Sequence, residues 1–405
     1  MTKPETVGLS RARLARIDQF LKDRYVDAGK LAGASVMVSR KGEIAHFGVV
    51  GQGDLERGKA LKEDSIYRIY SMTKPLTSVA LMMLVEEGAI ALEDPVEKFI
   101  PSWKDLGVFE AGVAPLFMTR RPTRPMQVID LLRHTSGLTY GFQNRTNVDA
   151  AYRKAAFGGV DSKLPLESMI EELARLPLEF SPGEAWNYSV STDVVGYLVQ
   201  VASGMPFADF LHSRLIDPLK MVDTGFHVPA EKADRFVACY GRGPDGKLAL
   251  QDDPAKSSYL APPSFYSGGG GLVSTSSDYM RFCQMLLNGG ALDGTRYLSR
   301  KTLALMTANH LPGGKDLTEL SRSLFSEATN AGIGFGLGFA VNIDPTAAMI
   351  SSSKGEYYWG GAASTAFWVD PAEELAVVFM TQLLPSSTYP LRRELRTLVY
   401  AAFDD

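Results

Sequence analysis

The sequence predicts a mixed α/β (α+β) fold, in which an antiparallel sheet is flanked by helices and carries an inserted, helix-rich lobe. Strand patterns occur near both ends of the 405-residue chain, and helical patterns separated by Pro and Gly fill its middle. With 45% hydrophobic residues, a chain of this length can bury a sizeable core. We therefore expect residues 1–88 and 265–405 to form one sheet domain, with residues 89–264 as the inserted lobe.

The first elements are predicted to be a helix and a hairpin. Residues 9–29 place apolar side chains at helical spacing, and this pattern ends near Gly29. The stretch "GASVMVSRKGEIAHFGVVGQGD" then gives two short β-rich runs around Lys41 and Gly42. An antiparallel sheet is expected to begin there.

The rest of the chain is predicted to supply the lobe helices and then the second half of the sheet. Amphipathic or apolar helical patterns cover residues 126–133, 166–176, 191–203 and 276–288. Residues 386–403 predict a closing helix. Before it, three stretches predict successive strands: "GFGLGFAVNID", "EYYWGGAASTAFWVDP" and "ELAVVFMTQ".

Composition excludes several classes of protein. The net charge of −4 and the pI of about 5.9 provide no basic surface for nucleic acid and no polybasic membrane anchor. No apolar run is long enough to span a bilayer, and the charged N-terminus does not resemble a signal peptide. We expect a cytoplasmic enzyme with a small-molecule substrate. The oligomeric state is left open.

The sequence suggests no metal or other cofactor. Cys239 and Cys283 are the two cysteines, so neither a disulfide framework nor a CxxC site is predicted. The five histidines are scattered and show no HExxH spacing.

The stretch "SMTKPLTSVALMMLVEEG" places Ser71 three residues before Lys74, where an apolar helical pattern begins. Residues at i and i+3 share one face of a helix, so the hydroxyl and the amine are expected to meet. Pro75 fits the first turn of such a helix. A helix N-terminus also offers unpaired N–H groups and a positive dipole end, which favour an oxyanion at Ser71. The alternative is a serine cap with a solvated lysine.

Two other features compete for the nucleophile role. "SSSK" at residues 351–354 repeats the Ser-x-x-Lys spacing, but it lies in a polar, Gly-flanked link between predicted strands. His134 suggests a histidine triad, but the GxSxG motif of an α/β-hydrolase is absent from the sequence. We therefore favour Ser71 and interpret His134 as structural.

Three motifs in order, "SMTK", "EAWNYSVSTDVVGYL" and "YWGGAAS", resemble the serine β-lactamase and penicillin-binding-protein superfamily. Within its class C branch the chain is most similar to the family VIII carboxylesterases. Further matching stretches are "LLRHTSGL", "FSPGEAWNYS" and "GGGGLVSTSSDYMRFCQMLLNGG", so the resemblance covers nearly the full length. It implies a β-lactamase-like fold and a serine hydrolase.

Two departures from the β-lactamase pattern bear on the substrate. Val190 stands two residues after the motif tyrosine, where β-lactamases hold an asparagine that binds a substrate amide. Trp359, Gly360 and Gly361 replace the Lys-Thr-Gly motif, so an aromatic surface stands where a cation would pair with a substrate carboxylate. A neutral, apolar ester suits these residues better than a carboxylated peptide.

The resemblance implies roles for the remaining site residues. Tyr188 is the base in acylation and the acid toward the leaving alcohol, with Lys74 as its electrostatic partner, although which of the two acts first as base stays open. The oxyanion hole would consist of the backbone N–H groups of Ser71 and Ala362. Four aromatic residues beside the motifs are expected to line an apolar pocket, and the two motif glycines to contact substrate: Trp359, Tyr140, Phe142 and Tyr266, with Gly360 and Gly361.

These observations predict a serine esterase that hydrolyses small carboxylic esters through an acyl-enzyme on Ser71, and the resemblance implies that the acyl chains are short. The alternatives are a β-lactamase or DD-peptidase, an acyltransferase that uses an alcohol acceptor, and a catalytically silent binding protein of the same fold.

Overall fold

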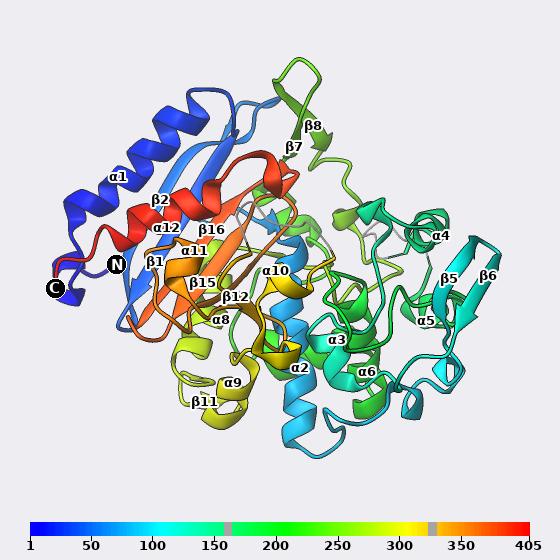
Figure 1. Cartoon of the computed structure of the whole chain (residues 1–405). Helices are drawn as coiled ribbons and strands as arrows, with labels where there is room; N and C mark the ends of the chain where they lie inside the picture. Colours follow the sequence, from blue (N-terminus) through cyan, green and yellow to red (C-terminus); the bar gives the residue numbers. More distant parts are fainter. Residues whose placement is uncertain (158–163, 323–329) are drawn as a thin grey trace.

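The computed structural model describes residues 1–157, 164–322 and 330–405. Its centre is an eight-stranded antiparallel sheet with the order β12-β13-β14-β15-β16-β1-β2-β3 (Figure 1). Three strands come from the N-terminal end of the chain and five from the C-terminal end, which confirms the predicted α+β fold: β1 (Gly33–Arg40), β2 (Glu43–Asp54), β3 (Lys59–Ala60), β12 (Ile333–Phe335), β13 (Ala340–Asn342), β14 (Tyr357–Gly360), β15 (Ala366–Asp370) and β16 (Leu375–Thr381).

A tight turn joins β1 to β2, as the sequence predicts. Lys41 has φ of 51° and Gly42 has φ of 81°. Two successive residues with positive φ are typical of the turn type that matches the twist of a two-residue β-hairpin. Gly42 adopts this conformation without a steric cost, which explains why the hairpin pattern is visible in the sequence.

Each face of the sheet packs against helices. Along β16, Val377 and Phe379 join the apolar cluster on one face, while Ala376 and Val378 join the cluster on the other. This alternation follows from the two-residue period of a strand. Helices α1 (Arg11–Leu21) and α12 (Leu391–Tyr400) cover the first face, and α8 (Ser276–Leu287) packs against the opposite face (Figure 1).

Helix α2 (Thr73–Glu86) runs through the centre of the molecule, between the sheet and the lobe (Figure 1). Its residues from Thr73 to Leu84 are all buried. A helix that is apolar on every side is stable only when it is enclosed, and here α6 of the lobe packs on it. A short 3-10 turn, Tyr70–Met72, leads into α2 and carries Ser71.

The lobe is rich in short helices and has one hairpin at its outer edge (Figure 1). Helix α6 has the predicted bounds, whereas α3 and α5 are shorter than predicted and α4 was not predicted. The elements of the lobe are α3 (Val128–Leu132), α4 (Asn147–Ala155), α5 (Leu166–Leu173), α6 (Ser191–Ser203), α7 (Phe207–Leu211), β5 (Val108–Val113), β6 (Leu116–Arg120), β7 (Cys239–Arg242) and β8 (Leu248–Asp252).

The smaller elements connect the two parts. Strand β7 pairs with β17 from the C-terminal end, so hydrogen bonds cross the predicted boundary of the lobe. The boundaries at residues 88 and 265 stay a prediction. The remaining helices and strands are β4 (Tyr67–Arg68), β9 (Val273–Ser274), β10 (Ala291–Leu292), β11 (Thr295–Arg296), β17 (Leu383–Leu384), α9 (Arg300–Met306), α10 (Leu317–Leu320) and α11 (Pro345–Ala348).

Two of the predicted strands are each two strands in the structure, and "EYYWGGAASTAFWVDP" forms β14 and β15. The stretch "GFGLGFAVNID" contributes to the hairpin of β12 and β13, because Gly338 at φ of 98° turns the chain between them. Across the described residues, no single helix combines the length and the apolar composition needed to cross a bilayer, although two segments bent by 84°, Ser191–Ser203 and Phe207–Ile216, meet both criteria as a pair.

Candidate active site

Ser71 lies in the short 3-10 turn that joins β4 to α2. Tyr70, the residue before it, has a φ of 42°, a conformation that is unfavourable for a residue with a side chain. Ser71 is half-buried, while Met72 behind it is fully buried. The turn therefore presents the Ser71 hydroxyl at the surface of the core rather than inside it.

Lys74 lies one helical turn from Ser71, as predicted, and is only 2% exposed. Its Nζ donates to Ser71 Oγ at 3.3 Å, to the Tyr140 hydroxyl at 3.1 Å and to the Gly269 carbonyl at 2.7 Å. An ammonium group has three N–H donors and no acceptor. Three oxygen atoms surround Nζ: the Gly269 carbonyl can only accept a hydrogen bond, whereas the two hydroxyls can accept or donate.

Tyr188 approaches the same serine from the lobe. It lies just before α6 and is 2% exposed. Its hydroxyl donates to Ser71 Oγ at 2.6 Å, across 117 positions of sequence. Because hydroxyl hydrogens rotate, the same contact lets Ser71 donate to the Tyr188 oxygen. The structure thus brings Ser71, Lys74 and Tyr188 together at one point.

The ring of Tyr188 is held between other aromatic side chains. His134 lies with its ring 5.0 Å from that of Tyr188, and Trp186 stacks at 6.3 Å with an angle of 18° between the planes. Burial and the nearby Lys74 charge lower the pKa of His134 well below its usual value, so the imidazole is neutral. His134 Nδ1 contacts Ser189 Oγ at 3.2 Å, which is the structural role that the sequence predicts for it.

A buried carboxylate lies behind Lys74. Asp193 on α6 accepts hydrogen bonds through Oδ1 from Ser267 Oγ at 2.6 Å and from the Gly269 N–H at 2.9 Å. Burial raises the pKa of Asp193, and the hydrogen bond from Ser267 and the Lys74 charge oppose that shift. The Gly269 carbonyl in turn accepts from Lys74. Asp193 therefore supports the lysine through one intervening residue.

Tyr140 contacts the amine. It is buried, and burial together with the Asp193 charge raises its pKa well above the usual value, which keeps the phenol protonated. The structure places its hydroxyl on Lys74 rather than in an open pocket. Phe142 stacks on the Tyr140 ring at 4.7 Å and is 49% exposed, so it offers an apolar surface to solvent.

The motif glycines bring the turn after β14 close to Ser71. A Cβ added to Gly361 would lie 2.4 Å from the carbonyl oxygen of Ile69, two residues before Ser71. Only glycine permits this approach. Ala362 follows in the turn and is half-buried. The spacing places the Ala362 peptide beside the segment that carries Ser71.

Trp359 faces the same side as Tyr188. The two rings are 5.5 Å apart, and Trp359 is half-buried on β14. Val190 is fully buried, so the side chain two residues after Tyr188 offers no amide to a substrate. Tyr266 packs edge-on against Phe226 at 5.2 Å, and its predicted part in binding stays a prediction.

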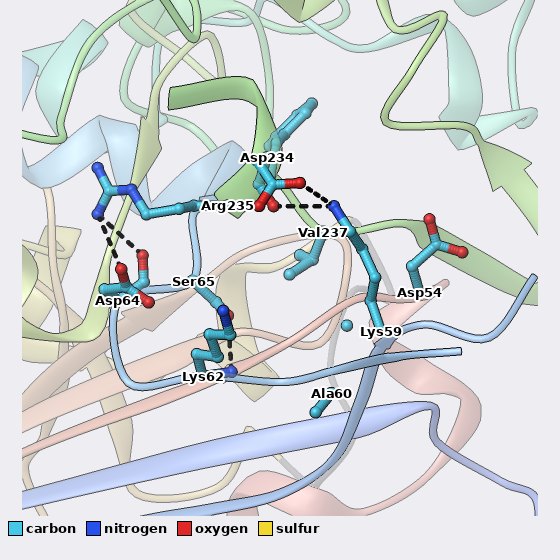
Figure 2. Close-up of a pocket in the computed structure, with 11 residues that line it drawn as sticks. Asp54, Lys59, Ala60, Lys62, Asp64, Ser65, Asp234, Arg235 and Val237 are labelled. Atoms are coloured by element: carbon cyan, nitrogen blue, oxygen red, sulfur yellow. Dashed lines mark hydrogen bonds and ion pairs between the residues drawn. The ribbon is translucent and has the colours of Figure 1, made fainter. Parts of the chain in front are cut away.

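A cavity of about 100 Å³ lies away from these residues, between β3 and residues 234–237 (Figure 2). Two ion pairs lie in its lining: Lys59 with Asp234, and Arg235 with Asp64 at 3.7 Å. The lining residues include no tyrosine, and the hydrogen bond from Lys62 to Ser65 Oγ comes from the backbone N–H of the lysine rather than from its amine. This cavity lacks the groups that acyl transfer requires.

Sequence reasoning missed three contributors to the site: the Gly269 carbonyl, the carboxylate of Asp193 and the contact of Tyr140 with Lys74. The run of four glycines at 268–271 is the one visible signal, because an added Cβ at Gly269 would lie 2.8 Å from Asp193 Oδ2. In the structure, Gly269 contacts both Lys74 and Asp193 there.

Comparison with known proteins is consistent with this geometry. Residues 17–401 match the family described as Beta-lactamase. Esterase EstB of Burkholderia gladioli is 30% identical, over 98% of each chain, and an uncharacterised protein of Mycobacterium tuberculosis is 36% identical over 89% of this chain and 88% of its own. The solved structure of EstCE1, titled a hydrolase with promiscuous acyltransferase activity, superposes with a TM-score of 0.80 at 24% identity, over 96% of this chain and 99% of its own. The chain belongs to the beta-lactamase family of serine hydrolases.

Proposed function

We propose that this protein is a carboxylesterase that hydrolyses small, short-acyl esters through an acyl-enzyme on Ser71. The observation that carries the proposal is that Ser71 Oγ is hydrogen-bonded to both Lys74 and Tyr188 in a largely buried site. EstB, an esterase by name, aligns with this chain over almost its whole length, which supports ester rather than amide chemistry.

In the first half-reaction Tyr188 has already released its phenol proton to solvent and stands as a phenolate beside the Lys74 ammonium; Ser71 Oγ then attacks the carbonyl carbon of the ester, and the serine proton passes to the phenolate oxygen. The carbonyl becomes a tetrahedral oxyanion, which accepts hydrogen bonds from the backbone N–H groups of Ser71 and Ala362. Tyr188 then gives the proton to the leaving alcohol, and the C–O bond to that alcohol breaks. Water repeats the sequence on the acyl-Ser71 ester and releases the acid.

Lys74 acts electrostatically in this scheme. Three oxygen atoms surround its Nζ, and that Nζ lies 4.5 Å from the centre of the Tyr188 ring. A positive charge at this position stabilises the negative charge that develops on the tyrosine oxygen as its proton leaves. This arrangement supports Tyr188, rather than Lys74, as the base that receives the serine proton.

The residues around the site favour a neutral substrate. Trp359 and the exposed Phe142 are apolar, and Val190 replaces the amide that a β-lactamase would use. An ester therefore gains apolar contact, while the site provides no equivalent of the motif lysine for a carboxylate. The preference for short acyl chains rests on the resemblance to the family VIII carboxylesterases.

The test is a panel of substrates on the purified protein. We expect p-nitrophenyl acetate and butyrate to be hydrolysed faster than the octanoate and dodecanoate, and nitrocefin to be turned over far more slowly than butyrate. Ser71→Ala serves as the blank for non-enzymatic hydrolysis. Dominant nitrocefin turnover would favour a β-lactamase, and transfer of the acyl group to an added alcohol in preference to water would favour an acyltransferase.

A further inference from the structure

The turn between β14 and β15 is held from outside the catalytic site by an arginine of the C-terminal helix. Within the turn, the Gly361 N–H donates to the Thr365 carbonyl at 2.9 Å, and the Ser364 N–H donates to the Gly361 carbonyl at 3.1 Å. Arg392, the second residue of α12, adds two bonds: its Nη2 donates to the Gly361 carbonyl at 2.9 Å and to the Thr365 carbonyl at 3.0 Å.

The bond from Arg392 to the Gly361 carbonyl involves the same peptide group that carries the Ala362 N–H. The Gly361 carbonyl and the Ala362 N–H belong to one planar trans peptide, so they point in opposite directions. An anchor on the carbonyl therefore fixes the direction of the N–H. Gly361 itself lies against the Ile69 carbonyl, which sets the distance of this peptide from the segment that leads to Ser71.

Gly360 lets Arg392 reach the turn. A Cβ added to Gly360 would lie 2.4 Å from the Arg392 Cζ, so the guanidinium occupies the space that a side chain would need. Successive residues of a strand face opposite sides of the sheet. Trp359 and Gly361 accordingly face the catalytic site, and Gly360 faces α12 and its arginine. The two glycines of the Trp-Gly-Gly motif thus have separate uses.

We propose that Arg392 is a positioning residue for the oxyanion hole: by holding the Gly361 carbonyl, it aims the Ala362 N–H at the acyl oxygen of the substrate. The inference rests on the proposed esterase function, because it assigns Arg392 a part in forming that oxyanion hole. The Ser364 N–H keeps a second bond on the same carbonyl, so loss of Arg392 weakens the anchor without abolishing it.

The experiment compares Arg392→Ala with Arg393→Ala, a matched control on the next residue of the same helix. Removal of a whole oxyanion donor costs about 10²–10³-fold in kcat, so we expect a smaller loss, roughly 10-fold or more, for Arg392→Ala with p-nitrophenyl butyrate. KM should change little, because the Ala362 N–H acts mainly on the transition state. Arg393→Ala should retain full activity.

Two further measurements separate positioning from simple loss of stability. Added guanidinium, far below denaturing concentrations, should restore part of the activity of Arg392→Ala and leave Arg393→Ala unchanged. Gly360→Ala displaces the guanidinium of Arg392 but keeps its charge in the protein. It should lower kcat when it is the only substitution, and it should lower kcat little further when it is combined with Arg392→Ala.

Different outcomes test the positioning role of Arg392 and the esterase function itself. Equal activity of the Arg392→Ala and Arg393→Ala variants would overturn the inference and leave the esterase function intact. A loss in Arg392→Ala that follows a lower melting temperature and shows no rescue by guanidinium would also overturn it. Absence of esterase activity in the unsubstituted protein would overturn the proposed function, and this inference with it.

Discussion

The chain contains two Ser-x-x-Lys segments, and the structure places them in opposite environments. Ser71 and Lys74 bracket the start of a buried helix and share a hydrogen bond at 3.3 Å. Ser351 and Lys354 are both exposed in the loop between α11 and β14. The same local spacing therefore gives a bonded pair in one place and two solvated side chains in the other.

The difference lies in what the rest of the fold brings to the pair. Tyr188 from the lobe bonds to Ser71, and the Gly269 carbonyl and Tyr140 bond to Lys74. Each of these partners is separated from the motif by more than 60 residues of sequence. Ser71 is a candidate nucleophile because three distant segments contact it or its neighbour Lys74. The Ser-x-x-Lys spacing is necessary for this arrangement but does not produce it alone.

The largest expected effect comes from removing one serine at a time. Ser71→Ala should reduce kcat/KM for p-nitrophenyl butyrate by about 10⁴-fold or more, because it removes the hydroxyl that is hydrogen-bonded to both Lys74 and Tyr188. Ser351→Ala should leave it within about twofold. A fluorophosphonate probe should add one adduct to the protein, at Ser71, detected by peptide mass spectrometry. An adduct on Ser351 would reverse the comparison.

Tyr188→Phe tests whether the hydroxyl of Tyr188 is what makes the Ser-x-x-Lys segment at residues 71–74 catalytic, in contrast to the one at residues 351–354. It removes one hydroxyl and keeps the ring that packs on His134 and Trp186, so the fold should persist. Loss of a positioned acid and base costs about 10²–10⁴-fold, and we expect kcat to fall within that range. The check is a steady-state assay with thermal unfolding measured in parallel. Near-normal kcat in a folded variant would assign the proton transfer to Lys74.

The sequence predicted the elements that depend on local chemistry. The hairpin at Lys41 and Gly42 follows from a glycine that adopts positive φ without a steric cost, between two β-rich runs, and α6 follows from an apolar pattern with the observed bounds. Ser71, Lys74 and Tyr188 could be named because their motifs match a known family. Their mutual distances, by contrast, are set by how the lobe docks on α2.

The supporting contacts could not be predicted for the same reason. Asp193 reaches Gly269 across 76 positions, and Arg392 reaches Gly361 across 31. Neither residue belongs to a motif that specifies its partner, and a buried aspartate on an otherwise apolar helix face has no local pattern that distinguishes it from an exposed one. Such contacts depend on tertiary packing, which periodicity in the sequence does not encode.

Trp359→Lys changes a neighbour of the catalytic residues while Ser71 and Lys74 stay intact. A lysine here restores a cation beside the site, so an ester with a free carboxylate should gain about 10-fold in kcat/KM relative to a neutral ester of similar size. Trp359→Phe is the matched control, because it keeps an apolar ring without the charge. The ratio of the two substrates is the measurement, and an unchanged ratio would show that position 359 does not face the substrate.

The smallest expected change in activity comes from replacing Asp193. The surroundings of the two lysines differ here, because Lys354 is exposed to solvent whereas Lys74 has the buried Asp193 side chain nearby. Asp193→Asn keeps an oxygen that accepts from Ser267 and Gly269 but removes the negative charge. Loss of a negative charge makes every neighbouring group easier to deprotonate. Both limbs of the pH profile of kcat/KM should therefore move to lower pH, with only a several-fold change at the optimum.

Stability provides an independent measure of the same charge. Folding raises the pKa of Asp193, chiefly by burial, so the protonated carboxyl is favoured in the folded state. Its contribution to the free energy of unfolding is greatest below the unfolded value of about 3.9 and declines as pH rises through the raised folded value. Asp193→Asn should remove that decline, which urea unfolding over a pH series would detect. If the pH profile of kcat/KM shifts but the pH dependence of stability does not, the charge of Asp193 affects catalysis but not stability. If neither curve changes, the charge of Asp193 has no effect on Lys74.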